Sequence, residues 1–124
     1  MRLEKTVLEQ LQRDAASSER EICGALIGTT RDIVGSVALH NHSSDPGTSF
    51  FISASDVLEL QQRGTDVSGF YHSHPHSSAV PSARDLEQAV PGYIYLILTR
   101  DGDARAWQLR EDRSSFDEIE WLTE

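Results

Sequence analysis

The first pattern along the chain is a helical repeat of apolar residues. Leu3, Val7, Leu8, Leu11 and Ala15 recur at helical spacing, with charged and polar residues between them. This spacing places the apolar side chains on one face of a helix. Residues 3–15 are therefore predicted to form an amphipathic helix.

The patterns further along the chain are typical of strands. Short apolar runs indicate buried strands, and an alternation of apolar and polar residues near the C-terminus indicates another. The predicted strands are residues 22–29, 32–40, 67–74, 93–99 and 104–110. A short Thr-Thr-Arg connection separates the first two, which favours a hairpin.

Two more segments carry the start and stop signals of helices. Residues 53–64 begin with Ser53 and Asp56 in the spacing of a capping box, and they end at a glycine. Residues 81–90 open on Pro-Ser and close at Pro-Gly, which predicts a short helix. The tail, residues 114–124, is interpreted as either an edge strand or a docking segment.

The order of these elements predicts the fold class. The order is helix, two strands, helix, strand, helix and two strands. It predicts a single mixed β-sheet flanked by helices, which is an α/β (α+β) fold. The chain has 124 residues, of which 38% are hydrophobic and 25% charged, as in soluble globular proteins. We therefore assign residues 1–124 to a single domain.

Composition and charge limit the partners of the chain. Because 20 acidic residues oppose 11 basic ones, the net charge is −9, and such a surface repels nucleic-acid phosphates. The longest apolar run is too short to cross a bilayer, and the first residues lack the apolar core of a signal peptide. One cysteine, Cys23, cannot form an internal disulfide. We expect a cytoplasmic protein that binds neither nucleic acid nor membrane.

The strongest candidate site lies in residues 72–85, HSHPHSSAVPSARD. Side chains two apart on a strand point to the same face, so His72 and His74 project together. Asp85, in the first turn of the next helix, can add an oxygen ligand. Two imidazoles and one carboxylate suit Zn²⁺ and leave a fourth tetrahedral position open, as in catalytic rather than structural zinc sites.

Each part of this site also has a structural interpretation. Ser82 and Asp85 have the spacing of a capping box, and a His-x-His pair is common on exposed strands.

A metal-activated water also needs a general base. Glu21 is the candidate because it lies at the start of an apolar strand, where burial would raise its pKa. The alternative is a solvated glutamate at a strand edge.

The remaining histidines and the cysteine are interpreted structurally. His76 is assigned to the rim of the site, because a third histidine ligand would close the site to water. His40 and His42 form a second His-x-His, without a carboxylate partner at a useful spacing. Cys23 lies within an apolar strand, which favours a packed thiol. The two tryptophans, Trp107 and Trp121, are interpreted as core or interface aromatics.

Three strings resemble the JAMM (MPN+) metalloprotease family. They are EICGALIG from Glu21, HSHP from His72, and SARD from Ser82 to Asp85. The family pattern is a glutamate on an early strand, then His-x-His-Pro, seven residues counted from that proline, and Ser-x-x-Asp. Residues 75–81 supply those seven. The resemblance implies the three-layer architecture that JAMM domains share with cytidine deaminases.

The resemblance also implies a role for each matching residue. His72, His74 and Asp85 would bind one Zn²⁺ per chain. Glu21 would act as the general base and then as the acid for the leaving amine. Ser82 would donate a hydrogen bond to the oxyanion of the tetrahedral intermediate.

The substrate implied by the resemblance is an amide or isopeptide bond after the Gly-Gly tail of a ubiquitin-like protein. The β-grasp, sulfur-carrier and archaeal modifier proteins belong to this class. Residues 44–52 and 76–81 are candidate contacts for such a tail, and a homodimer is compatible with the resemblance. The alternatives are a catalytically silent scaffold, which would lack ligands that this chain has, and a metallohydrolase of a small amide.

Overall fold

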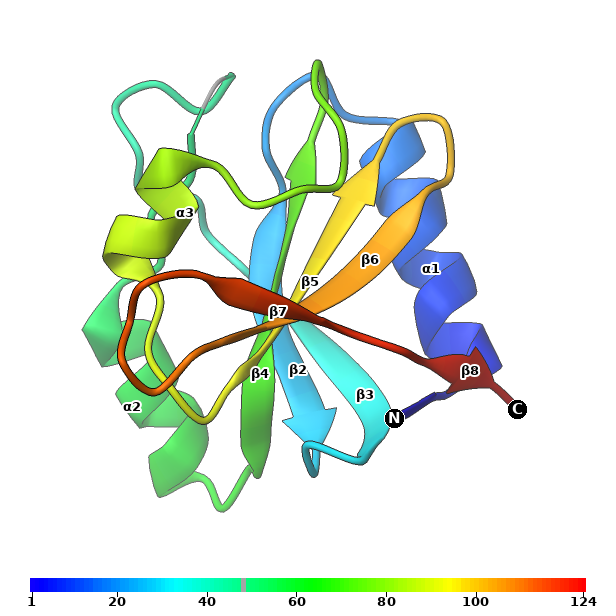
Figure 1. Ribbon diagram of the computed structural model, residues 1–124, viewed down its shortest axis with the longest axis vertical. Coiled ribbons are helices and arrows are strands. Elements are labelled where there is room, and N and C mark those ends of the chain that lie inside the picture. The colour runs from blue at the N-terminus through cyan, green and yellow to red at the C-terminus, as the bar shows by residue number, and fades with distance from the viewer. Residues whose placement is uncertain (48) are drawn as a thin grey trace.

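The computed structural model describes residues 1–47 and 49–124. Within these residues, eight strands form one mixed sheet and three helices accompany it (Figure 1). The strands are β1 (Arg2–Leu3), β2 (Cys23–Gly28), β3 (Asp32–Leu39), β4 (Val67–His74), β5 (Ile94–Thr99), β6 (Ala104–Leu109), β7 (Phe116–Ile119) and β8 (Leu122–Thr123). The helices are α1 (Lys5–Ala16), α2 (Ala54–Gln62) and α3 (Ala83–Gln88). The predicted fold class is confirmed.

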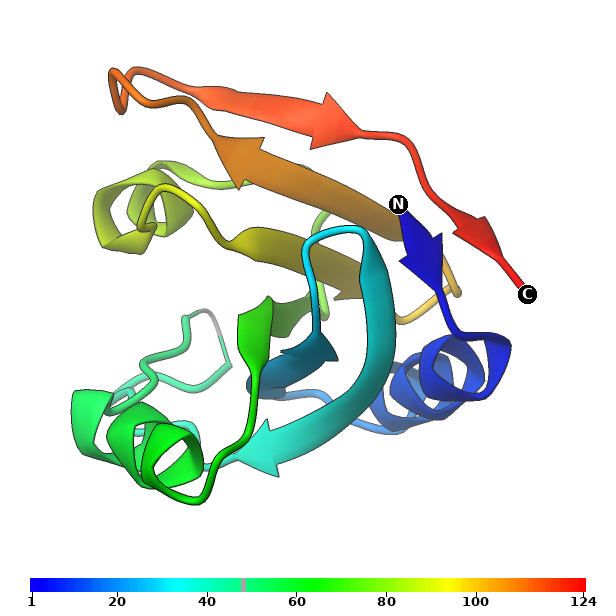
Figure 2. The ribbon, with the colours of Figure 1, turned by 90° about the horizontal axis from the view of Figure 1, so that it is seen from below.

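The sheet is curled, with the strand order β7-β6-β5-β4-β2-β3-β1-β8. Strands β7 and β8 follow one another in the chain, yet they lie at opposite ends of this order. The tail therefore runs from one edge of the sheet to the other, and the two edges approach each other (Figure 2). The tail forms an edge strand on β6, as one of its two interpretations predicted, and then pairs with β1.

Helix α1 covers one face of the sheet. Its predicted apolar stripe is buried from Val7 to Ala15 against a core that includes Leu26, Tyr71 and Leu96. The predicted helix began too early, because Leu3 belongs to β1 and pairs with Ile33 of β3. A two-residue strand has no periodicity of its own, so its apolar residue cannot be separated from the helical pattern that follows.

The opposite face of the sheet carries a second apolar cluster, beneath α3. One alanine from the loop before α3 and one that directly follows α3 pack there with aromatic and aliphatic residues of β5 and β6. The buried members are Ala79, Ala89, Tyr95, Ile97, Trp107 and Leu109. Figure 1 shows α1 on one side of the sheet and α2 and α3 on the other, which gives the expected three layers. None of the helices among the described residues is long and apolar enough to cross a membrane.

Helix α2 starts at Ser53, as predicted, but only half of the predicted capping box forms. The Ser53 hydroxyl accepts a hydrogen bond from the backbone N–H of Ser55. The Asp56 carboxylate does not reach back to the start of the helix and instead pairs with His42. A long-range partner has therefore replaced the local one.

Strand β2 is packed tightly at Gly24, between the backbone of β3 and the Tyr71 ring of β4, so we expect a side chain there to lower the stability of the fold. A Cβ at Gly24 would overlap the Val37 carbonyl oxygen and the Tyr71 ring. Gly24→Ala should therefore lower the free energy of unfolding by about 2 kcal/mol, measured as the urea midpoint.

Gly35→Ala is the matched control on the neighbouring strand. A Cβ there would meet the Cβ of Ile27 at 3.5 Å, which is an ordinary contact. Its unfolding free energy should change by less than about 0.5 kcal/mol. Equal midpoints for the two variants would contradict the close approach at Gly24.

Candidate metal centre

Strand β4 brings His72 and His74 together on the face of the sheet opposite α1. The strand alternates, so Tyr71 packs in the α1 core while the two histidines project to the other side. Both imidazoles are buried, with exposed fractions of 1% and 6%. Their Nε2 atoms lie 3.1 Å apart. The predicted convergence of these two side chains is present in the structure.

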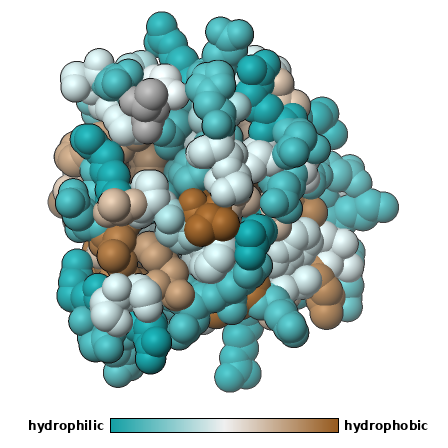
Figure 3. Space-filling view, turned by 45° about the horizontal axis from the view of Figure 1, so that its top comes forward, coloured by the Kyte–Doolittle hydropathy of each residue, from teal (hydrophilic) through white to brown (hydrophobic). Residues whose placement is uncertain are grey.

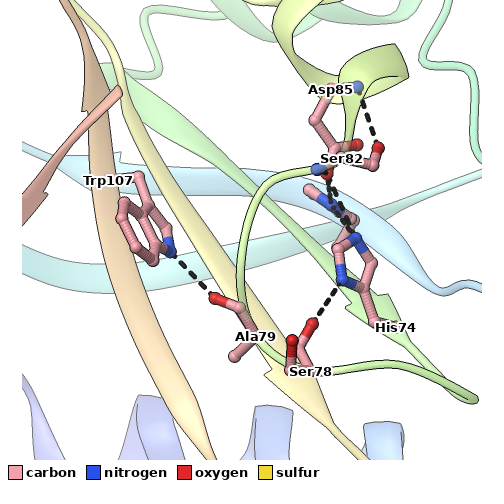
Figure 4. Close-up of polar contacts among 7 residues, drawn as sticks. His74, Ser78, Ala79, Ser82, Asp85 and Trp107 are labelled. Carbon is pink, nitrogen blue, oxygen red and sulfur yellow. Dashed lines mark hydrogen bonds and ion pairs between the residues drawn. The ribbon is translucent and has the colours of Figure 1, made fainter. Parts of the chain in front are cut away.

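Asp85 completes a three-residue cluster with the histidines. The chain leaves β4, crosses the sheet and enters α3, whose first turn returns Asp85 over the end of β4 (Figure 4). Its Oδ2 lies 3.2 Å from His72 Nε2 and 3.1 Å from His74 Nε2. The same oxygen accepts a hydrogen bond from the Ser82 backbone N–H at 2.9 Å, and the Asp85 N–H donates to Ser82 Oγ at 3.1 Å. The capping box and the side-chain cluster therefore coexist.

The loop between β4 and α3 fixes the orientation of His74. Its Nδ1 lies 2.7 Å from the carbonyl oxygen of Ser78, which can only accept a hydrogen bond, so Nδ1 carries the proton. The lone pair of Nε2 then faces the cluster, as a metal ligand requires. Trp107 Nε1 donates to the Ala79 carbonyl oxygen at 3.0 Å (Figure 4). Trp107 is a buried aromatic, as predicted, and it also anchors this loop.

His72 is oriented by packing rather than by a second hydrogen bond. Its ring stacks on Phe50, with 4.2 Å between ring centroids and an interplanar angle of 21°. The buried Nδ1 has no hydrogen-bond partner among the described residues. Stacking on Phe50 therefore holds the plane of the His72 ring, whereas the Ser78 carbonyl also sets the tautomer of His74.

Glu21 reaches the cluster because β2 pairs antiparallel with β4. Cys23 lies opposite His72, so the residue two positions earlier lies beside the end of β4. Ligand atoms of Glu21, His72 and His74 all lie within 4.8 Å of one another. Glu21 is 5% exposed, which excludes the alternative of a solvated strand-edge glutamate.

Ser73, between the two histidines, holds the segment that carries Glu21. Its side chain is fully buried, and its Oγ accepts a hydrogen bond from the Ile22 N–H at 2.9 Å. Its own N–H donates to the Ile22 carbonyl oxygen at 3.0 Å. This role of Ser73 could not be predicted from the sequence, because nothing local connects the serine to residue 22.

Asn41 was also missed, although it lies inside the second His-x-His. Its Nδ2 donates to the carbonyl oxygens of Glu21 and Ser49, and its Oδ1 accepts from the N–H groups of Ser43 and Phe51. One side chain therefore ties the Glu21 backbone to the loop that carries Phe50. The feature of the sequence that could have indicated this role was an asparagine in a turn-rich segment, rather than the histidines beside it.

The prediction that the second His-x-His lacks a carboxylate partner is wrong for His42. Its Nε2 lies 3.1 Å from Asp56 Oδ2, fourteen residues along the chain. The rings of His40 and His42 meet edge to face at 4.5 Å. Both histidines are exposed, and they lie outside the buried cluster.

Burial and charge shift the pKa values in the cluster in different directions. Burial raises the pKa of Glu21 to about 7, against the nearby charge of His74. Burial would also raise the pKa of Asp85, but hydrogen bonds with His72 and His74 hold it well below its usual range. Burial lowers the pKa of His72. Burial raises the pKa of Cys23 to about 11, so its buried thiol stays protonated, as the packed-thiol interpretation predicts.

The geometry of the cluster fits a metal ion. Donor atoms about 2.1 Å from a tetrahedral ion lie about 3.4 Å from one another. The three donors of His72, His74 and Asp85 are separated by 3.1 to 3.2 Å, so a single centre can reach them all with small adjustments. His76 is exposed on the rim, as predicted, and is not one of the clustered groups.

Two cavities meet at this cluster. One, of about 340 Å³, is lined by apolar residues, among them Phe51, Val57 and Phe70. The other, of about 240 Å³, is lined by polar residues, among them Glu21 and Ser82. Hydrophobic side chains gather in Figure 3 on the side of the molecule where α2 and α3 lie, within a mostly hydrophilic surface. The cluster therefore has an apolar side and a polar side.

Comparisons with known proteins show the family of the chain. A family model described as prokaryotic homologs of the JAB domain matches residues 3–110. A desampylase from Haloferax volcanii is 33% identical over 86% of this chain and 83% of its own length. A probable TtuB-protein conjugate cleaving protease from Thermus thermophilus is 32% identical over 65% of this chain and 57% of its own length.

Solved structures have the same fold. A solution structure of a protein from Desulfitobacterium hafniense, 25% identical, covers 99% of this chain and 92% of its own, with a TM-score of 0.80. A JAB1/MPN domain protein from Archaeoglobus fulgidus, 20% identical, covers 99% of this chain and 98% of its own, with a TM-score of 0.66. The family match spans most of the chain and includes every residue of the cluster. The chain belongs to the prokaryotic homologs of the JAB domain.

Proposed function

We propose that the protein is a zinc-dependent isopeptidase that hydrolyses the amide bond after the Gly-Gly tail of a ubiquitin-like protein. The observation that carries the proposal is the buried cluster of His72, His74 and Asp85, with Glu21 beside it. The names of two relatives, a desampylase and a TtuB-protein conjugate cleaving protease, support this class of substrate.

His72, His74 and Asp85 are the proposed zinc ligands. Two neutral imidazoles and one carboxylate are a common donor set for catalytic zinc. When bound, Zn²⁺ would polarise the scissile carbonyl and make water more acidic. The contacts of His74 with Ser78 and of Asp85 with Ser82 keep these two ligands in place.

Glu21 is the proposed general base. Its carboxylate forms no hydrogen bond with other described side chains, so it is free to take the proton of an attacking water. The same group then returns the proton to the leaving amine. The backbone contacts with Asn41 and Pro46 hold the start of this strand at the mouth of the cluster.

Ser82 is the proposed oxyanion donor. Its Oγ accepts a hydrogen bond from the Asp85 N–H, and a hydroxyl that accepts one bond still has its own proton to donate. Because Ser82 lines the polar cavity beside Glu21, this proton is available to a carbonyl oxygen near the cluster.

The two cavities suggest how the substrate lies across the site. Glu21 must reach the leaving nitrogen, and of these two cavities it lines the polar one, together with His74 and Asp85, so the leaving amine belongs there. The acyl side of the bond then lies toward the apolar cavity. Phe50, Asp85 and Gln88 line both cavities and mark the boundary that the Gly-Gly tail would cross. The candidate contact segments 44–52 and 76–81 contribute to these walls.

Replacing the proposed base should separate catalysis from metal binding. Glu21→Gln keeps the shape of the side chain but cannot take a proton, so kcat should fall at least about 100-fold. The assay would use a β-grasp protein whose C-terminal Gly-Gly is joined to a lysine of a reporter protein, with cleavage followed by mass spectrometry.

Glu19→Gln is the matched control, because the same change is made at an exposed glutamate two residues away. It should retain wild-type turnover, and both variants should retain zinc. Full turnover by Glu21→Gln would show that another group is the base. Cleavage of small amides but of no protein conjugate would replace the proposed substrate class.

Removing one proposed ligand should remove zinc and its effect on stability. Wild-type protein should bind one zinc ion per chain, and saturating zinc should stabilise the fold by about 2–3 kcal/mol. In His74→Ala both the bound zinc and the rise in Tm should be lost. Metal content and thermal unfolding with and without a chelator measure the two effects.

His40→Ala is the control for this experiment, because His40 is an exposed histidine outside the cluster. It should bind zinc as the wild type does. Equal zinc content in His74→Ala and the wild type would disprove the proposed ligand set.

A further inference from the structure

The polar cavity contains a cation that the proposed chemistry does not use. Arg84 lines this cavity together with Glu21, His76 and Ser82. It is the one arginine or lysine among the described residues of the cavity wall. Within the described part of the chain, its guanidinium forms no hydrogen bond or close ion pair. The charge of Arg84 is therefore available to a bound molecule.

The position of Arg84 is set by the metal centre itself. It directly precedes Asp85 in α3, and the capping box between Ser82 and Asp85 fixes the backbone on both sides of it. The side chain is exposed at the mouth of the cavity rather than packed under it. Its five N–H donors match the geometry of a carboxylate.

The place of Arg84 relative to Glu21 decides which part of the substrate it can meet. The general acid has to reach the leaving nitrogen beside the proposed ligands, so the cavity lined by Glu21, His74 and Asp85 receives the leaving group. Arg84 lines that cavity and does not line the apolar one. A group bound by Arg84 therefore belongs to the leaving amine, not to the Gly-Gly tail.

We propose that Arg84 binds a carboxylate on the leaving group and makes the enzyme favour acid-bearing amines. The inference rests on the proposed function. The carboxylate has two sources, the α-carboxylate of a single leaving amino acid and an acidic side chain beside the acceptor lysine. The chain as a whole has a net charge of −9 and repels acidic molecules, so a cation at this point changes which leaving groups can approach.

The preference should be modest, because the pair is exposed to solvent. An exposed ion pair with good geometry corresponds to a factor of about five in binding. Salt screens such a pair, so the preference should decrease at high ionic strength.

The experiment compares kcat/KM for one β-grasp protein joined through Gly-Gly to four amines. In the first, the Gly-Gly carboxyl group acylates the ε-amine of free lysine, which keeps its α-carboxylate. In the second, the acceptor is Nα-acetyl-lysine amide, which is neutral. The other two acceptors are amidated peptides with glutamate or with lysine beside the acceptor lysine. The zinc-loaded wild type, Arg84→Ala, Arg84→Glu and the control Arg31→Ala are assayed. Arg31 is an exposed arginine in the turn between β2 and β3.

The wild type and Arg31→Ala should cleave at least one acid-bearing substrate about fivefold faster than the neutral one, mainly through KM. Arg84→Ala should bring this ratio to about one, and Arg84→Glu should favour the lysine-bearing peptide. The acid-bearing substrate that is cleaved faster than the neutral one identifies the source of the carboxylate.

Two further measurements keep the outcomes distinct. Binding of the same substrates to the Glu21→Gln variant should show the same preference, and the additional change Arg84→Ala should abolish it. Equal cleavage of all substrates by the wild type, or a preference that survives Arg84→Ala, would overturn the proposed role of Arg84 but not the proposed function. Cleavage of none of them would overturn the proposed function, and with it this inference.

Discussion

The antiparallel pairing of β2 with β4 is the constraint on which the site depends. The register that places Cys23 opposite His72 also brings Glu21 to the end of β4. A shift of one residue would turn the histidines into the α1 core, because side chains alternate between the two faces. Gly24 leaves room for the Tyr71 ring of β4, and Ser73 joins the ends of the two strands by two hydrogen bonds with Ile22. The fold and the site therefore share one set of backbone contacts.

Placing four ionisable groups in one buried cluster is costly unless each has a partner. Unpaired polar groups lose their water without compensation. Asp85 meets this requirement with the two histidines and the Ser82 N–H, and His74 meets it with Asp85 and Ser78. Glu21 has no such partner among the described side chains, and its raised pKa reflects this. The proposed ligands are thus held in place while the proposed base remains free, which is the distribution that hydrolysis would require.

Much of the fold could be predicted from local patterns, because each pattern reflects burial of one face. Residues 67–74 were predicted as a strand, and alternation alone paired His72 with His74. The two-residue strand at Leu3, the pairing of His42 with Asp56 and the hydrogen bonds of Asn41 were missed. These features depend on contacts between distant segments. The position of Glu21 relative to the histidines is of the same kind, so the residues alone left it open and only the family resemblance supported it.

Asp85 shows why structural and functional interpretations of a motif need not compete. Its Oδ2 begins α3 by accepting the Ser82 N–H, and the same oxygen faces both histidines. The helix start is therefore a consequence of the same carboxylate that completes the cluster. Because Ser82 and Arg84 precede Asp85 in the same turn, that contact also places their side chains at the polar cavity. A short capping motif thus couples the position of the ligand to the wall that a leaving group would meet.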